Sequence, residues 1–495
     1  MPVIARHRPR PFVIGMSGVI AGLVVLRSLV FVCWPASHFD SDQAVTGLMA
    51  KHLSELRAFP VFWYGQTYML GVEAWLAAPV MAIGGATVTA LKLPLLAMNV
   101  AVAVLLYRGF TAGTGLDERR AALATLPFVL AAPITAAHLL TANGGNVEPL
   151  LYVLLLWVLR TRPLWFGVVL GVGFLNREFT IYGAAALLLI EAAQRTLWTR
   201  EAARRYLVAF ATAAAVWIVA MVLRHFSSAA GPGTSTADLS TLLAANNLWQ
   251  IAERLCLDAR AIAAGVGQIF TVHWPELFGL EPQRLTDFGI ESTVRQGLGG
   301  TAWLLVPALA IPAVRLAQRS QPRCPFCLYL IVTAGLSIAG YLIGRCGVVD
   351  FYTMRYELLS VPGACGLGAW YLRAERSRAW LAVWGLAFIA ILTLSAVGHV
   401  RLIAEYLRQP PTAAKQELIA ALDARGIRYA YADYWTSYYV SFLTRERIIV
   451  ASDVIPKIRT YNRIVDEHRA EAIRISRSTC AGGEQLTPAF WSCRP

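Results

Sequence analysis

FVIGMSGVIAGLVVLRSLVFVC, residues 12–33, is an apolar stretch that is followed closely by His38-Phe-Asp-Ser-Asp-Gln43. A helix rises about 1.5 Å per residue, so about 20 apolar residues cross the hydrocarbon layer of a membrane. The stretch predicts a transmembrane helix that remains as an anchor, because it is too long and too lightly followed by small residues for a cleaved signal peptide. Asp40 and Asp42 are then expected just outside the membrane.

The rest of the chain has the same apolar character. Of its 495 residues, 57% are hydrophobic and only 15% are charged, which excludes an ordinary soluble domain. Further runs of sufficient length are Ala86 to Tyr107, Ala121 to Leu140, Tyr206 to Leu223, Thr301 to Leu316, Phe326 to Ile343 and Trp380 to Val397.

A second group of apolar segments is shorter. The chain between Val147 and Ala193 is interrupted at residues 161–163 and 176–178, which predicts three short helices, and another span is expected from Glu357 to Leu372. The total is about eleven transmembrane helices. The fold class is therefore a polytopic α-helical membrane protein.

Arginine residues orient the predicted helices. They fall in every second loop, as the positive-inside rule requires of cytoplasmic segments, so the net charge of +14 reflects topology. Recognition of a nucleic acid is the alternative, but the charges are spread over separate loops without a recognition motif. The clusters are Arg6, Arg8 and Arg10; Arg108, Arg119 and Arg120; Arg160 and Arg162; Arg195, Arg200, Arg204 and Arg205; Arg315, Arg319 and Arg323; and Arg373, Arg376 and Arg378.

This orientation predicts a transmembrane domain over residues 1–397 with a cytoplasmic N-terminus, and an exported domain over residues 398–495. Two outer loops are expected, a first one at 35–85 and a long one at 225–300. The stretch 229–237 of the long loop is rich in small residues and is expected to be mobile until substrate binds.

The exported domain reads as an α/β unit. Thr412 to Arg425 predicts an amphipathic helix ended by glycine, and Tyr429 to Tyr434 and Arg447 to Ala451 predict strands. Its two cysteines, Cys480 and Cys493, are close enough in sequence to form a disulfide. Two others, Cys256 and Cys346, lie in or near outer loops, and the motif from Cys324 to Cys327 is interpreted as structural or incidental.

The pair Asp40 and Asp42 is the strongest indication of chemistry. Carboxylates near a bilayer are unfavourable to desolvate, so the pair favours a bound cation, a hydroxyl to be deprotonated, or a sugar. The alternative is a helix N-cap before Gln43 to Lys51. A third acid, Glu73, lies in the same loop with His38 and Gln66. The loop also contains aromatic residues that are alternatively membrane-interface anchors, namely Trp63, Tyr64, Tyr68 and Trp75.

Nine segments of the chain follow a pattern known from one family of membrane proteins. They are Phe39 to Ala44, Gly47 to His52, Phe59-Pro60, Tyr64 to Tyr68, Glu73 to Pro79, Gly144 to Glu148, Arg355 to Pro362, Tyr431 to Trp435 and Phe442 to Arg447. In these segments, and most specifically in the first loop, the chain resembles bacterial GT-C glycosyltransferases, in particular family 39, the relatives of protein O-mannosyltransferases and of the lipid A aminoarabinose transferase. The resemblance covers most of the chain. It implies a transferase that takes a sugar from a polyprenyl-phosphate carrier at the outer face, with an acid of the first loop in catalysis.

Sugar transfer from a lipid phosphate needs a base for the acceptor hydroxyl and a positive partner for the phosphate that leaves. Asp40 matches the leading acid of the family motif and is predicted to be the base, with Asp42 orienting the acceptor or helping to hold a cation. The displacement is expected to invert the sugar, because no residue reads as a covalent nucleophile. Arg355, beside Tyr356, is predicted to bind the phosphate; its alternative is a snorkelling arginine.

Further candidates for substrate binding are Glu73, Tyr64, Gln66, Tyr68, Glu148, Arg177 and Glu178. Glu148 and Glu178 are alternatively placed by helix N-termini, which favour acids without any substrate. No cofactor is assigned; if a divalent metal ion is present, its ligands are expected to be Asp42, Glu148 and His38, whereas lone histidines such as His138 and His273 are commonly polar caps. The Asp-Ser-Asp spacing departs from the adjacent Asp-Glu pair of the mannosyltransferases, so metal dependence and substrate identity do not carry over.

The expected location is the bacterial inner membrane, with the C-terminal domain in the periplasm. The expected partners are a polyprenyl-phosphate-linked sugar, a lipid, glycan or protein acceptor, and membrane lipid. One alternative is a transporter or flippase for a lipid-linked sugar. Such proteins place charges and broken helices at the bilayer midplane, often in repeated halves, and the sequence indicates neither feature. The other is a non-catalytic binder of carrier lipid or glycan, on which Tyr434, Trp435 and Tyr438 stack.

Overall fold

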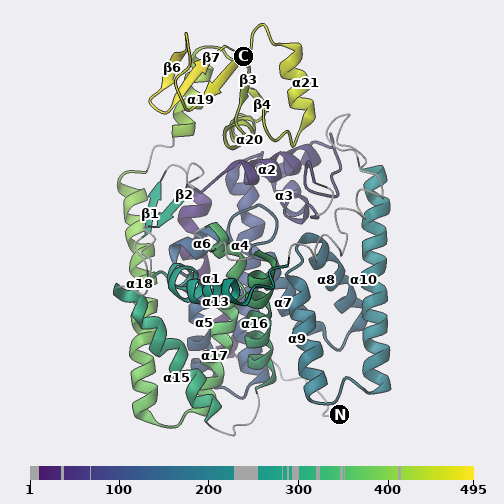
Figure 1. The fold of residues 1–495 in the computed structure, drawn as a ribbon, viewed down its shortest axis with the longest axis vertical. Coiled ribbons are helices and arrows are strands. Elements are labelled where there is room, and N and C mark those ends of the chain that lie inside the picture. The colour runs from purple at the N-terminus through teal and green to yellow at the C-terminus, as the bar shows by residue number, and fades with distance from the viewer. Residues whose placement is uncertain are drawn as a thin grey trace.

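A bundle of long helices carries an α/β domain at one end, and a layer of short helices lies between the two (Figure 1). The computed structural model describes residues 11–34, 38–66, 69–227, 255–280, 283–286, 289–292, 300–318, 324–345, 349, 352–410 and 414–494. Of the features predicted from the sequence, Tyr68, Cys346 and the stretch 229–237 lie outside the described residues.

Six helices of the described chain are long and apolar enough to cross a membrane. They confirm six of the predicted spans, so the chain is a multi-pass membrane protein. With 31 residues, α18 is about 46 Å long, longer than the hydrocarbon layer, and it extends past position 397 toward the α/β domain (Figure 1). The six are α1 (Pro11–Cys33), α4 (Val88–Gly113), α10 (Arg200–Phe226), η2 (Gly300–Leu304) continued by α15 (Leu305–Ala317), α16 (Pro325–Arg345) and α18 (Arg378–Arg408).

The predicted span from Ala121 to Leu140 is divided into α5 (Glu118–Val129) and α6 (Pro133–Leu139), which meet at 81°. Pro133 disfavours a helical conformation at the residue before it, and ψ there is 153°. Lipid cannot satisfy the carbonyl oxygens freed at the break. Arg27 of α1 donates to the carbonyl oxygen of Phe128, and His399 of α18 donates to that of Ala131 at 2.8 Å.

The three short helices expected between Val147 and Ala193 are α7 (Glu148–Leu159), α8 (Pro163–Asn176) and α9 (Thr180–Ala193). They have 12 to 14 residues, fewer than the about 20 that span a bilayer. By length the described chain has six spans, or seven with the bent pair, so the predicted total of about eleven is not confirmed. The span predicted from Glu357 to Leu372 corresponds to α17 (Ser360–Ala374), which follows a 3₁₀ turn, η3 (Tyr352–Glu357).

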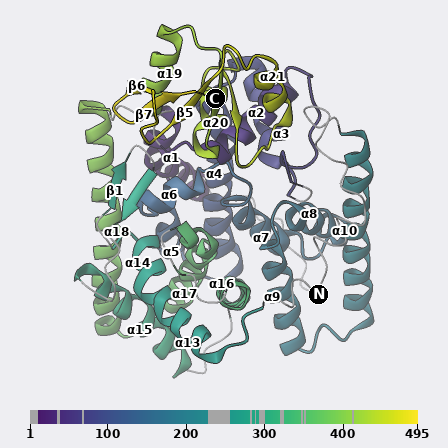
Figure 2. The same ribbon diagram turned by 45° about the horizontal axis from the view of Figure 1, so that its top comes forward.

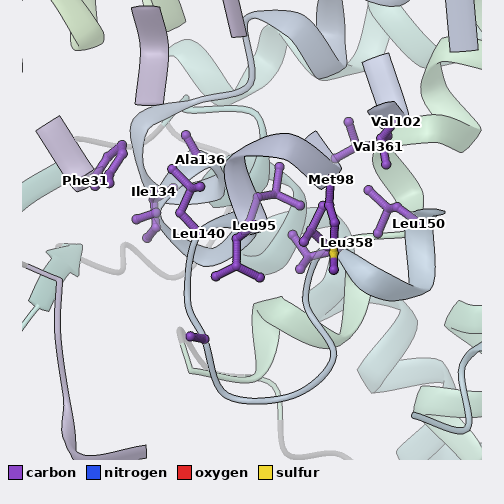
Figure 3. Packing of buried hydrophobic residues seen from close by; sticks show 14 of the residues in the cluster. Phe31, Leu95, Met98, Val102, Ile134, Ala136, Leu140, Leu150, Leu358 and Val361 are labelled. Atoms are coloured by element: carbon purple, nitrogen blue, oxygen red, sulfur yellow. The ribbon is translucent and has the colours of Figure 1, made fainter. Parts of the chain in front are cut away.

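Part of the hydrophobic core joins residues of α1, α4, α6, α7 and α17 (Figure 3). Close packing holds helices together inside a membrane, where the hydrophobic effect does not. A Cβ added to Gly109 of α4 would lie 2.2 Å from the ring of Phe326 in α16, and one on Gly363 of α17 would lie 2.5 Å from Ala334. The residues labelled in Figure 3 are Phe31, Leu95, Met98, Val102, Ile134, Ala136, Leu140, Leu150, Leu358 and Val361.

The first predicted loop forms α2 (Ser41–Ser54) and α3 (Val72–Gly84), between the bundle and the α/β domain (Figure 1). From Ser41 to His52, every residue of α2 except Asp42 is buried. Trp63 and Tyr64 are 4% and 3% exposed, so the alternative of membrane-interface anchors is wrong for these two. The described part of the long loop contains α13 (Ala259–Gln268), η1 (Ile269–His273), α14 (Trp274–Leu277), β1 (Gln283–Thr286) and β2 (Gly289–Ser292).

The C-terminal domain has the predicted α/β character (Figure 2). Its five strands are ordered β4-β3-β5-β7-β6, with β3 parallel to β4 and β5, and β7 antiparallel to β5 and β6. A disulfide joins Cys480 to Cys493, and another joins Cys324 to Cys327. The elements are α19 (Ala414–Ala424), β3 (Tyr429–Ala432), α20 (Tyr434–Leu443), β4 (Ile449–Ser452), α21 (Arg459–Glu467), β5 (Ile473–Ser476), β6 (Glu484–Thr487) and β7 (Phe490–Cys493).

The loop between α9 and α10, which carries part of the arginine series, lies at the end of the bundle opposite the α/β domain (Figure 1). This separation agrees with the orientation that the arginines predict. Which end faces the cytoplasm stays a prediction, as does the division of the chain at position 397.

Candidate active site

Asp40 and Asp42 occupy the N-terminus of α2, on the side of the bundle that carries the C-terminal domain. Asp40 is the N-cap, since its side chain accepts a hydrogen bond from the backbone N–H of Gln43 at 2.9 Å. The capping interpretation is therefore correct for Asp40. It uses only one carboxylate oxygen, however, and among the described residues no protein group donates to Oδ2 of Asp40. Both carboxylates are partly exposed.

The second acid is held by the C-terminal domain. The hydroxyl of Tyr434, the first residue of α20, donates to Oδ1 of Asp42. Burial and the negative charge of Asp40 raise the pKa of Asp42, and the hydrogen bond from Tyr434 and the charges of Arg355 and Lys457 offset part of this rise. Burial and Asp42 together raise the pKa of Tyr434, so the phenol keeps its proton and acts as the donor.

Lysine side chains surround the pair. Lys92 of α4 is fully buried, and its Nζ donates to the carbonyl oxygen of His38 at 2.8 Å. Nζ of Lys457 lies 4.9 Å from the centre of the Trp63 ring, and Nζ of Lys415 lies 4.3 Å from that of Tyr439. Burial lowers the pKa of Lys415 to about 8, although the charges of Asp40 and Asp433 act in the opposite direction.

His38 shapes the turn before the acids. Its backbone has φ 58°, in the left-handed region that non-glycine residues seldom adopt. Two side chains hold its carbonyl oxygen, Lys92 at 2.8 Å and Gln43 Nε2 at 3.0 Å. Burial lowers the pKa of His38 to about 3, with smaller contributions from the charges of Lys92 and His138, so the ring is neutral in the cell.

Arg355 approaches the site from η3. Its Nη2 lies 3.5 Å from the hydroxyl of Tyr356, while its buried Nε has no hydrogen-bond partner in the described structure. The ring of Tyr356 stacks on Tyr341 at 5.8 Å between centroids and meets Phe179 edge-on at 5.9 Å. A guanidinium with an unused donor close to Asp42 is suited to bind an anion.

Glu73 and Glu148 form a second acidic centre around the turn at Gly144. Glu73 accepts from the N–H of Gly144 at 2.7 Å, Glu148 accepts from that of Asn146 at 3.0 Å, and Arg177 Nε donates to the carbonyl oxygen of Gly144 at 2.5 Å. Both glutamates are buried. Burial, and then the neighbouring Glu148, raise the pKa of Glu73 well above its usual value, which fits a pair that shares a proton.

The turn at Gly144 and Gly145 requires glycine. Gly144 and Gly145 have φ of 74° and 116°, and a Cβ on Gly145 would lie 1.9 Å from Cγ of Arg177. Gln43 links this turn to the acid pair, because its Oε1 accepts from the N–H of Ala142 at 3.3 Å. The two acidic centres are thus parts of one connected arrangement.

Several predicted residues lie elsewhere. The Tyr64 hydroxyl is 3.0 Å from His52 Nδ1, Glu178 is exposed, and neither contacts Asp40 or Asp42 within the described structure. Gln66 is partly exposed with its Oε1 buried. The suggested metal ligands Asp42, Glu148 and His38 are not brought together: the described residues contain no group of three or more His, Cys, Asp or Glu side chains that could hold a metal ion.

Four residues at the site were not predicted there. Lys92, Lys415 and Lys457 were assigned no role from the sequence, and Tyr434 appeared only in the alternative of a glycan binder. The signal for Tyr434 was present, since it belongs to the segment Tyr431 to Trp435 that resembles the GT-C family.

Comparison with known proteins supports the fold. No protein-family model matches the chain, and no curated protein matches its sequence. The structure is similar to the crystal structure of ArnT from Cupriavidus metallidurans in the apo state, with a TM-score of 0.52 and 12% sequence identity over 94% of this chain and 93% of that one. ArnT has the GT-C fold. The present chain is thus a polytopic membrane protein with the GT-C fold, as the sequence resemblance predicted.

Proposed function

We propose that the protein is a membrane glycosyltransferase that moves a sugar from a polyprenyl-phosphate-linked donor to an acceptor at the face that carries α2. The observation that carries this proposal is the acid pair Asp40 and Asp42, which stands partly exposed among Lys92, Arg355 and Lys457 on a GT-C fold. A carboxylate next to cations supplies both requirements of the reaction, a base for the acceptor and a partner for the phosphate that leaves.

In the proposed step, Oδ2 of Asp40 takes the proton of the acceptor hydroxyl. The acceptor oxygen forms its bond to the anomeric carbon while the bond from that carbon to the phosphate oxygen breaks, and the phosphate leaves with the bonding electrons. A single displacement of this kind inverts the anomeric centre. Asp42, held by Tyr434, orients the acceptor.

Arg355 binds the leaving phosphate in this proposal. Its buried Nε has no hydrogen-bond partner among the described residues, and its charge acts on Asp42. A snorkelling arginine, the alternative interpretation, would keep its guanidinium in water. Glu73, Glu148 and Arg177 support the site through the Gly144 turn.

The proposed setting is the bacterial inner membrane, with the N-terminus in the cytoplasm and the C-terminal domain in the periplasm. The proposed partners are the carrier-linked sugar and a lipid, glycan or protein acceptor. The similarity to ArnT, one structural neighbour of this chain, supports a lipid acceptor as the first choice to test. No step of the mechanism depends on a metal ion.

The bent pair α5–α6 favours the flippase alternative, because transporters use broken helices. The sequence had suggested no such break. At this break, however, the polar side chains are used for the backbone: Arg27 and His399 donate to freed carbonyl oxygens. They are therefore engaged in structure, which leaves the acid pair as the better candidate for chemistry.

The test is sugar transfer by the purified protein from a panel of polyprenyl-phosphate monosaccharides, with and without EDTA, beside Asp40→Asn and Asp42→Asn. Asparagine caps helices as well as aspartate does, so Asp40→Asn keeps α2 intact. Asp117→Asn, at the N-cap of α5, is the matched control. Loss of transfer in Asp40→Asn alone or in both site variants, with carrier lipid still bound, supports the proposal. Carrier binding without transfer by the wild-type protein, from any donor, would favour a flippase or a binding protein.

A further inference from the structure

The C-terminal domain lies directly on the helix that carries the acid pair. A Cβ on Gly47, in the middle of α2, would lie 2.6 Å from the ring of Phe442 in α20, so the two helices are in close contact. The ring of Phe39 lies 5.5 Å from that of Tyr439 and 5.4 Å from that of Phe442. These contacts pack α20 directly against α2.

A polar cluster stabilises the same interface near the C-terminal end of α2. Glu446, just after α20, bonds Lys51 at 2.6 Å and His52 at 2.9 Å, and it also binds Arg57. Tyr461 of α21 donates to the same carboxylate at 2.8 Å. Burial alone would raise the pKa of Glu446, but these donors outweigh burial and hold it well below its usual value. The cluster keeps α20 in a fixed register on α2.

The near end of α20 meets Asp42. β3 ends at Ala432, and Asp433 caps α20 by accepting from the N–H of Thr436 at 2.9 Å. This turn makes Tyr434 the first residue of the helix, beyond the carboxyl end of a parallel strand, where α/β domains commonly place functional groups. Tyr434 is 7% exposed, packs edge-on against Trp435 and Tyr438, and donates to Asp42.

We propose that Tyr434 is a positioning residue of the active site, and that the C-terminal domain therefore contributes a side chain to the active site of the transferase. The inference rests on the proposed function. By occupying one oxygen of Asp42, Tyr434 fixes that carboxylate against the acceptor and leaves Oδ2 of Asp40 as the open base. The two aspartates thus differ in their role because Tyr434, which lies 392 residues after Asp42 in the chain, donates a hydrogen bond to Asp42.

The test uses Tyr434→Phe in the full-length protein. Tyr431→Phe is the matched control, because Tyr431 also donates to an aspartate, Asp466, at 2.6 Å in the same domain. Because the Asp42 carboxylate loses the donor that fixes its position, we expect kcat of Tyr434→Phe to fall about tenfold to a hundredfold with little change in KM. Tyr431→Phe is expected to keep wild-type kcat.

The pH profile separates positioning from folding. Among the described residues, four groups act on the pKa of Asp42: Asp40 at the N-cap of α2, Tyr434 on α20, Arg355 on η3 and Lys457 before α21. Removing the phenol leaves the other three in place and raises the pKa of Asp42 further. The acidic limb of kcat against pH is expected to move to higher pH in Tyr434→Phe and to stay in place in Tyr431→Phe.

A double-mutant cycle on thermal unfolding, with Asp42→Asn and Tyr434→Phe, measures the contact without any substrate. Coupling between the two substitutions, together with the kinetic changes above, supports the proposal. Wild-type kcat and an unmoved acidic limb in Tyr434→Phe, in a protein that transfers sugar, would overturn the positioning role alone. A wild-type protein that transfers no sugar would overturn the proposed function, whatever the cycle shows, and the positioning role with it.

Discussion

Lys92 Nζ donates a hydrogen bond to the carbonyl oxygen of His38 at 2.8 Å, two residues before Asp40. The contact joins a transmembrane helix to the strained turn that presents the acid pair. His38 keeps φ 58° because Lys92 and Gln43 hold its carbonyl oxygen. The position of Asp40 thus depends on a buried lysine that has no acid directly bonded to it in the described structure.

Lys92→Met is expected to lower kcat about tenfold to a hundredfold, because it keeps the side-chain volume but removes the donor that fixes the turn and a positive charge near Asp40. Transfer by the purified variant measures the effect. Thr89→Val is the control on the same helix, since Thr89 donates to the carbonyl oxygen of Val32 at 2.8 Å, away from the acids. Equal kcat in both variants would contradict the role of Lys92.

Glu446→Gln is expected to lower the free energy of unfolding at neutral pH by about 3 kcal/mol, because Lys51, His52 and Arg57 lose their common charged partner. A carboxyl whose folded pKa is depressed stabilises the protein above its unfolded pKa of about 4.3, and this stability is lost only as pH falls through the folded value. Unfolding curves at pH 7 and at pH values below 4 measure both effects. Asp423→Asn, which breaks the more exposed pair with Arg447, is expected to change stability by under about 1 kcal/mol.

Glu73→Gln is expected to change the pH dependence of stability in the opposite sense. The folded pKa of Glu73 is raised, so its contribution is present below the unfolded pKa of about 4.3 and is lost as pH rises through the folded value. Glutamine resembles the protonated acid at all pH values. The midpoint temperature of the variant relative to wild type should therefore increase from pH 4 to pH 8. A constant difference between the two midpoint temperatures would show that Glu73 is ionised in the folded protein.

Arg27→Met is expected to destabilise the protein by about 2 kcal/mol, because the carbonyl oxygen of Phe128 and the side chain of Asn99 lose a donor in the buried interior of the bundle. Arg119→Met removes an exposed arginine from α5 and serves as the control. Thermal unfolding in detergent compares the two. Equal midpoints would mean that water reaches the break between α5 and α6.

The sequence predicted the long helices well because each is an uninterrupted apolar run, and it placed the three short helices from their breaks at residues 161–163 and 176–178. It missed the bend at Pro133, because an apolar run has the same composition whether straight or broken. The strand predicted to reach Tyr434 ends at Ala432 for a local reason, the capping of α20 by Asp433.

The acid pair was evident in the sequence because two aspartates after a membrane span are unusual. The positions of Lys92, Lys457 and Tyr434 beside the pair were not evident, since these residues come from separate elements and approach Asp40 and Asp42 only in the folded chain. The roles of all these residues in catalysis stay predictions.

The most direct test of the account is sugar transfer by purified Asp40→Asn and Asp42→Asn, each measured with saturating donor alongside binding of the carrier lipid. The account predicts that Asp40→Asn loses about a thousandfold or more in kcat while carrier binding and thermal stability stay at wild-type values, because the general base is gone and the N-cap remains. Near-wild-type transfer by Asp40→Asn, with activity lost only in Asp42→Asn, would contradict the assignment of the base.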